Sequence, residues 1–155
     1  MHTRRSVVRA VMVVMVLSMV LPMVSSIRVG SVHAAPPMTT LAEPDTVAPA
    51  PIINLTAETG PLPGTVILYW NASGDDATAG TATAYVIRYA SAPVDDAAWD
   101  TATDVTGEPA PQTAGTPQTM VVGGLAAGAK IYFAVKSQDE VPNTSTISNV
   151  AAVVS

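Results

Sequence analysis

Apolar and polar side chains alternate along short stretches of the second half of this chain. In the first such stretch, Val66, Leu68 and Trp70 occupy every second position. The same period recurs at Tyr85, Ile87 and Tyr89, and again at Ile131, Phe133 and Val135. A period of two places large apolar side chains on one face of a strand. The pattern therefore predicts sheets that pack face to face.

Turn-forming residues separate these stretches and set the extent of each strand. Glycine and proline gather at residues 60–64, and glycine recurs at 123–124 and 128. Outside the first 34 residues, no segment of helical length shows a period of 3.6. We predict an all-β, seven-stranded sandwich with strands at 53–57, 65–70, 84–90, 102–106, 118–122, 130–137 and 148–154.

The N-terminus has the three parts of a secretory signal peptide. Arginines at 4, 5 and 9 precede an uncharged, apolar stretch at residues 10–24, and Val32-His33-Ala34 supplies an exit site. We predict a signal peptide helix that is cleaved after Ala34, with Ala35 as the alternative position. The protein is then expected to be secreted, either free outside the cell or at the cell surface. Two alternatives stay open: residues 10–27 are retained as a membrane anchor, or the paired arginines direct twin-arginine export rather than the general route.

Cleavage would leave an exported chain that divides in two by composition. Residues 35–50 are rich in proline, threonine and alanine without a period, which is typical of an extended linker. Residues 51–155 contain all the predicted strands. The 121 residues left after cleavage, 35–155, suffice for one modest core, so we expect a single domain.

Charge and composition exclude several classes of function. Beyond residue 34, three basic residues (Arg88, Lys130 and Lys136) face twelve acidic ones, which gives a net charge of −9. Such a surface repels nucleic acid and anionic membranes, and it favours a monomer. The same stretch has no histidine or cysteine, so a histidine-activated nucleophile and a zinc site of nitrogen and sulfur ligands are both impossible. We expect no enzyme activity, no catalytic residues and no bound organic cofactor.

Over residues 48–155 the chain resembles a fibronectin type III domain. The resemblance rests on Ala50-Pro51 before the first strand, Trp70 at the end of the second, and the strand Tyr85–Tyr89. Leu125 with Gly128, and then Ser148-Asn149-Val150, complete it. The run from Gly74 to Tyr85 is similar to a variant of bacterial exported members. One feature departs from the family, since Ile131 stands where a corner tyrosine is usual and Tyr132 would face the other way.

The resemblance implies a non-catalytic module that acts as a spacer or contacts proteins or cell-surface glycans. An alternative is a polysaccharide-binding accessory module of a secreted glycoside hydrolase. Family members are commonly parts of longer proteins, so this chain is also a candidate fragment of a multidomain protein.

Four acidic side chains are the candidate metal ligands. Asp75 and Asp76 lie in one predicted loop, Asp139 and Glu140 in another, and in this kind of sandwich the two loops share one end. Loop carboxylates suit calcium. The competing interpretation is a solvated acidic rim with turn-forming aspartates.

Trp99 is the candidate ligand-binding aromatic residue. It follows the strand at 84–90 in a long excursion. One interpretation is that its ring fastens this excursion to the sheet, and the other is that it forms an exposed platform for a sugar ring.

Overall fold

A computed structural model describes residues 43–141 and 143–155 of the chain. The predicted signal peptide, its cleavage site and linker residues 35–42 lie outside the described residues. Among those described, no helix combines the length and the apolar character that a membrane crossing requires.

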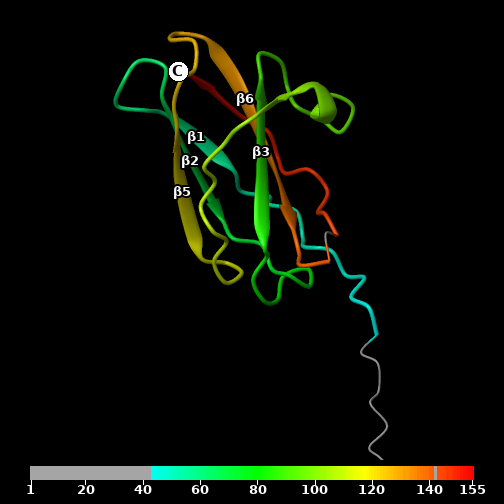
Figure 1. Ribbon diagram of the computed structural model, residues 1–155. Coiled ribbons are helices and arrows are strands. Elements are labelled where there is room, and N and C mark those ends of the chain that lie inside the picture. The colour runs from blue at the N-terminus through cyan, green and yellow to red at the C-terminus, as the bar shows by residue number, and fades with distance from the viewer. Residues whose placement is uncertain (1–42, 142) are drawn as a thin grey trace, which may run out of the picture. The chain divides into compact units, whose positions relative to one another are not determined.

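Two antiparallel sheets pack face to face (Figure 1). The three-stranded sheet has the order β1-β2-β5, with β1 at Thr56–Thr59, β2 at Val66–Asn71 and β5 at Pro117–Val122. The four-stranded sheet has the order β4-β3-β6-β7, with β4 at Thr103–Asp104, β3 at Ala84–Ala90, β6 at Lys130–Gln138 and β7 at Ala151–Val154. In the described part of the chain, a 3-10 turn, η1, spans Trp99–Thr101. The predicted all-β sandwich of seven strands is confirmed.

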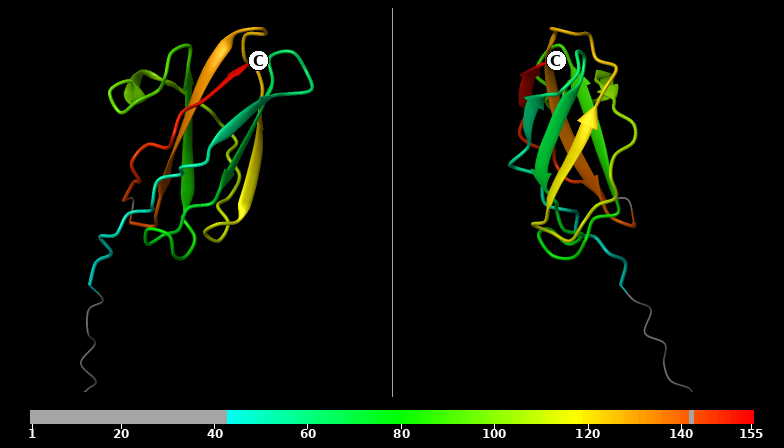
Figure 2. Two further views of the ribbon diagram at one scale, coloured as in Figure 1. Left: turned by 180° about the vertical axis from the view of Figure 1, so that it is seen from behind. Right: turned by 90° about the vertical axis from the view of Figure 1, so that its left-hand side faces the viewer.

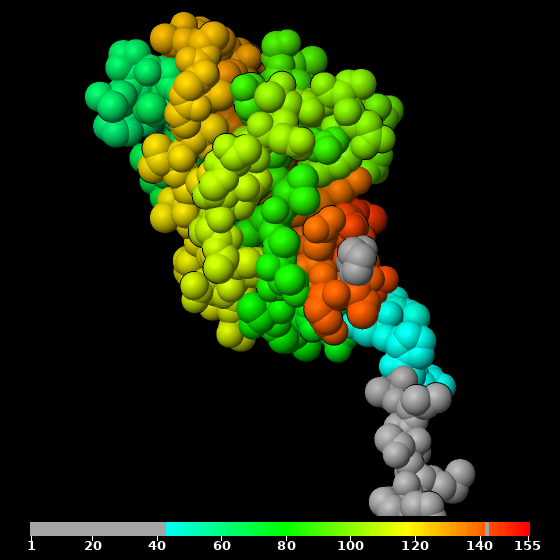
Figure 3. All heavy atoms as spheres, viewed as in Figure 1, coloured from blue at the N-terminus to red at the C-terminus, as the bar shows by residue number. Residues whose placement is uncertain are grey.

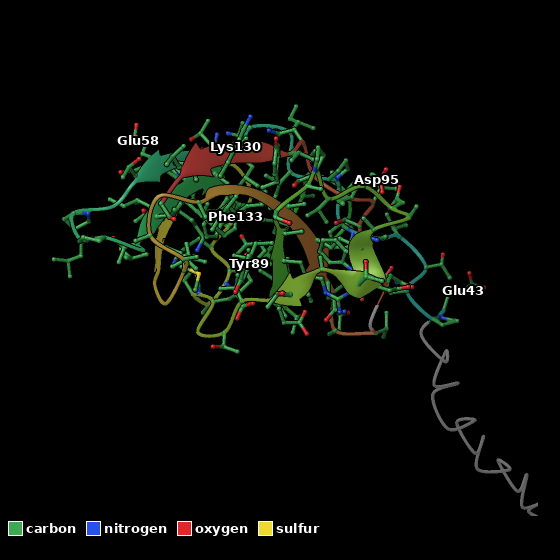
Figure 4. All side chains as sticks on the ribbon, turned by 90° about the horizontal axis from the view of Figure 1, so that it is seen from above. Glu43, Glu58, Tyr89, Asp95, Lys130 and Phe133 are labelled. Carbon is green, nitrogen blue, oxygen red and sulfur yellow. The ribbon has the colours of Figure 1, made fainter. Side chains whose placement is uncertain are left out.

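The core lies between the sheets, where the period-two residues face each other. Trp70 and Phe133 are the largest side chains there, and Tyr85 meets Trp70 edge to face, with ring centroids 5.4 Å apart. Figure 4 shows Phe133 and Tyr89 in the interior and Glu58 and Asp95 at the periphery. Each large side chain contributes about 1.5–3 kcal/mol as it leaves water, before the entropy cost. The predicted core is confirmed, except that Tyr89 is only partly buried.

The corner between β5 and β6 is fastened to the turn between β1 and β2. Leu125 donates its N–H to the Gly64 carbonyl at 3.0 Å. Gly64 has φ of +74°, and a Cβ there would collide with the Leu125 carbonyl, so only glycine fits. Ile131 is buried, while Tyr132 lies on the outer face beside Lys130. The prediction that the tyrosine here points away from the core is confirmed.

The last strand begins later than predicted because serine hydroxyls replace backbone groups along β6. Ser148 Oγ accepts the Val135 N–H at 2.9 Å, and Ser145 Oγ accepts the Ser137 N–H at 2.9 Å. Residues 145–150 therefore run beside β6 without forming a regular ladder, and β7 begins only at Ala151.

The two ends of the described chain lie at opposite ends of the sandwich (Figures 1 and 2). The incoming segment pairs with the β2–β3 loop, where Ala50 donates its N–H to the Ala77 carbonyl at 2.9 Å. Ser155 is bonded to the β5–β6 turn, donating its N–H to the Ala129 carbonyl at 3.1 Å. Residues 48–50, which we predicted to be linker, thus belong to the folded unit.

Candidate functional site

Three carboxylates converge where the incoming segment meets the β2–β3 and β6–β7 loops. Asp45, Asp75 and Glu140 each place a carboxylate oxygen within 4.8 Å of the others. Two of them, Asp75 and Glu140, are predicted ligands. The loops therefore share one end of the sandwich, as expected.

Asp45 was missed by sequence reasoning because it lies in the predicted linker. Only the backbone pairing of the incoming segment with the β2–β3 loop, at the Pro49–Ala77 bridge, brings it to this end. An isolated aspartate in a segment rich in proline and threonine carries no signal of such docking, so the sequence offered no means of finding it.

Asp139 and Asp76 lie outside this group of three. Asp139 is buried, and its Oδ1 accepts the N–H groups of Val141 and Asn143 at 3.0 and 2.7 Å. Its Oδ2 accepts the Asn143 side-chain amide at 2.7 Å. Both oxygens thus serve to shape the β6–β7 loop. Asp76 is exposed in the β2–β3 loop and forms a backbone bridge with Ala79.

Asp75 is the most perturbed member of the group. Its Oδ1 is buried and has no hydrogen-bond partner among the described residues. Burial raises the pKa of Asp75 above its ordinary value of 3.8, and the neighbouring charge of Glu140 raises this pKa further. Asp76 and Asp139 act in the same direction. No cation of the described chain forms an ion pair with Asp75, so the group gathers negative charge without compensation.

The chemistry open to this group is limited. Carboxylate oxygens suit a hard divalent cation, but calcium prefers six to eight oxygen ligands and three carboxylates supply only part of that set. The predicted calcium site therefore stays a prediction.

Trp99 fastens the β3–β4 excursion to the outer face of the four-stranded sheet. Its side chain is only 8% exposed and packs with Val94 and Ala134. The Arg88 guanidinium lies 5.0 Å and the Lys136 ammonium 4.7 Å from the ring centroid. The light green segment in Figure 3 lies over this face. With both cations on a buried ring, the exposed sugar platform is the wrong interpretation of Trp99, and the fastening role fits the contacts.

The same cations also pair with an acid of β4 and an acid of the excursion. Arg88 Nε lies 2.7 Å from Asp104 Oδ1, and Lys136 Nζ lies 3.4 Å from Asp96 Oδ1. Lys130, the third cation, lies over the Tyr132 ring at 5.2 Å. All three basic residues of the described chain are thus on one sheet and are engaged within the domain.

A cleft of about 550 Å³ opens beside the first strand. Its walls come from residues 50–54, 71–74, 77–78 and 114–115. None of its thirteen lining residues is charged, although the cleft is close in sequence to the acidic group. It was not predicted, because small residues such as Ala72 and Gly115 carry no pattern of their own.

Neither protein-family models nor curated proteins gave a match. Among solved structures, the chain is similar to a Fn3-like protein from Clostridium thermocellum, with 23% identity over 68% of this chain and 92% of that one, and a TM-score of 0.46. The strand order decides the assignment, since β1-β2-β5 packed on β4-β3-β6-β7 is the ABE and C′CFG arrangement. The fold is fibronectin type III-like.

In fibronectin type III-like terms, the acidic group lies at the end that carries the BC and FG loops. Asp75 belongs to the BC loop and Glu140 to the FG loop, while Trp99 lies between strands C and C′. No other described segment lies over the outer face of the ABE sheet in the right-hand view of Figure 2.

Proposed function

We propose that this protein is an exported, non-catalytic module that works as a spacer or an interaction unit outside the cell. The observation that carries the proposal is the position of the two ends. Glu43 to Ala50 enter at the BC–FG end, and Ser155 is bonded at the opposite end. A domain with this geometry separates whatever is attached to its two termini by its full length.

The composition of the exported part supports a role without catalysis. Residues 35–155 contain no histidine or cysteine to activate a nucleophile. Among the three grouped carboxylates, Asp45 and Asp75 are half-buried and Glu140 is exposed, which differs from the deep, dry setting that prepares an acid and base pair for hydrolysis.

Export is tested by expressing the full chain in a bacterial host and fractionating the cells. We expect the protein outside the cytoplasm, with a mass and N-terminal sequence that begin at Ala35. An intact N-terminus in the membrane fraction would instead support the retained anchor, and cytoplasmic retention would contradict export.

The spacer role is tested by joining a fluorescent reporter to each end of residues 35–155. We expect one narrow distribution of reporter separations, insensitive to salt and narrower than the distribution given by a flexible linker with the same number of residues. Unfolding should lengthen and broaden the separation, because an unfolded chain is more expanded than the folded domain, and such a change supports the domain as the origin of the fixed separation. A broad distribution in the folded protein would contradict the spacer role. Incubation with glycoside hydrolase substrates should give no turnover.

A further inference from the structure

The outer face of the ABE sheet presents aromatic, hydroxyl and amide groups with almost no charge. Tyr69 of β2 lies between Thr56 of β1 and Thr119 of β5 in one row across the three strands. The next row holds Glu58, Ile67 and Val121. Glu58 is the only charged residue among the outward-facing positions of these strands, in a domain whose net charge is −9.

The side chains of the first row are free to meet a ligand. Tyr69 is 37% exposed, and both threonines are exposed. Within the described chain, none of the three side chains makes a hydrogen bond to another residue, and Tyr69 does not pair with another ring. Because neighbouring strands lie about 4.8 Å apart, the row extends about 10 Å across a flat surface.

Along β2, the exposed face that carries Tyr69 leads into the cleft described above. Asn71 follows Tyr69 on the same face of β2 and also lines the cleft, together with Asn54 and the highly exposed Ile53. The backbone N–H of Asn71 is held by the Asn54 side-chain oxygen at 3.1 Å, which leaves the Asn71 amide free within the described domain. The sheet face and the cleft thus form one uncharged surface.

We propose that this surface binds a neutral polysaccharide. An aromatic ring flanked by hydroxyls and amides stacks on the apolar face of a sugar and exchanges hydrogen bonds with its hydroxyls. Charge selects among glycans: the three cations of the described chain lie on the other sheet and are engaged there, so a polyanionic chain meets only repulsion. The ring that sequence analysis singled out, Trp99, plays no part. The inference rests on the proposed function and gives the interaction unit a ligand class.

The test is retention of the purified protein by cellulose, chitin, xylan and mannan as neutral polymers, with alginate and heparin as polyanions. We expect retention by at least one neutral polymer and by neither polyanion. Tyr69→Ala should weaken that retention by about tenfold, and Tyr69→Phe, which keeps the ring, by much less. Tyr69 faces solvent, so neither substitution opens the core, and thermal melts verify folding.

Tyr132→Ala is the matched control, because it removes a tyrosine from the outer face of the other sheet. It should leave retention unchanged. The proposal is overturned if no neutral polymer retains the protein, if Tyr69→Ala binds like the parent, or if retention follows polymer charge. A concentration-dependent dimer that Tyr69→Ala disrupts would overturn it too, since the face would then bind protein. Each of these failures leaves export and the fixed separation of the two ends intact, so it is distinguishable from failure of the proposed function.

Discussion

The side chain of Asn149 acts toward Leu55 as a neighbouring strand would. Its Oδ1 accepts the Leu55 N–H at 2.9 Å, and its Nδ2 donates to the Leu55 carbonyl at 2.8 Å. The Asn149 N–H in turn reaches the Ile52 carbonyl at 3.2 Å. One amide thus joins the edges of the two sheets, where the backbones of β1 and β7 are not hydrogen-bonded in a common ladder.

Asn149→Ala should destabilise the domain by about 1–3 kcal/mol, because two backbone groups of the buried Leu55 lose their partner. Denaturant unfolding of the purified variant measures this change. Asn71→Ala is the matched control: its exposed amide bonds to no other described residue, and its replacement should change stability by less than about 0.5 kcal/mol. Equal effects for the two variants would show that the Leu55 bonds contribute nothing.

Tyr85→Phe should also lower stability, by about 1–2 kcal/mol. The Tyr85 hydroxyl donates to the Gln118 side-chain oxygen in the core, and Gln118 Nε2 donates to the Ala110 carbonyl at 3.0 Å. Burial raises the pKa of Tyr85, so the hydroxyl stays protonated and donates at neutral pH. Chemical denaturation measures the loss. Tyr89→Phe, at a partly buried position where the hydroxyl has no described partner, should be close to neutral.

Trp99→Ala should cost about 3 kcal/mol or more, since it empties the small cluster that fastens the β3–β4 excursion. The variant should also expose this excursion to proteolysis, while Trp99→Phe preserves most of the packing. Unfolding curves and limited digestion measure the two effects. Retention by neutral polysaccharide should be unchanged in any Trp99 variant that folds. A folded Trp99 variant that loses retention would show that Trp99 contacts the sugar.

The sequence predicted the architecture well because period-two burial depends on local order alone. Trp70, Ile87 and Phe133 reach the core by simple alternation, and no long-range information is needed to place them. Strand ends were predicted less well. The start of β7 depends on hydroxyls of Ser145 and Ser148 that replace backbone groups, a choice that no propensity encodes.

The candidate site was harder to predict, for a physical reason. Asp75 and Glu140 meet because the topology brings their loops to one end, and the predicted sandwich already placed the two loops there. Asp45 joins them through backbone pairing of the incoming segment, and Asp139 turns inward to satisfy loop N–H groups. The first outcome depends on backbone pairing between segments far apart in sequence, and the second on hydrogen bonds within a single loop. The Tyr69 face needed the register of three strands, which residue spacing alone does not supply.

The calcium prediction is decided by thermal melts with added calcium and with a chelator. If Asp45, Asp75 and Glu140 hold the ion, calcium should raise the midpoint of the parent, and Glu140→Gln should abolish the rise. Asp104→Asn is the control for net charge, because this exposed carboxylate lies on the other sheet. Identical midpoints in calcium and chelator would remove the calcium site.

Asp75→Asn should stabilise the domain at neutral pH in the presence of a chelator. The pKa of Asp75 is raised in the folded state, first by burial and then by Glu140, so the folded protein holds this proton more tightly than the unfolded chain. The stability linked to the proton is complete below the ordinary pKa of 3.8 and is lost as pH rises through the folded value. The melting midpoint of Asp75→Asn should therefore exceed that of the parent at neutral pH, and the gap should close as the pH falls below 3.8.

Glu58→Gln, which removes the same charge from the exposed β1, controls for net charge. A gap that is constant across the pH range, or that Glu58→Gln reproduces, would contradict the prediction. It would show that the raised pKa of Asp75 does not lower the stability of the folded domain at neutral pH.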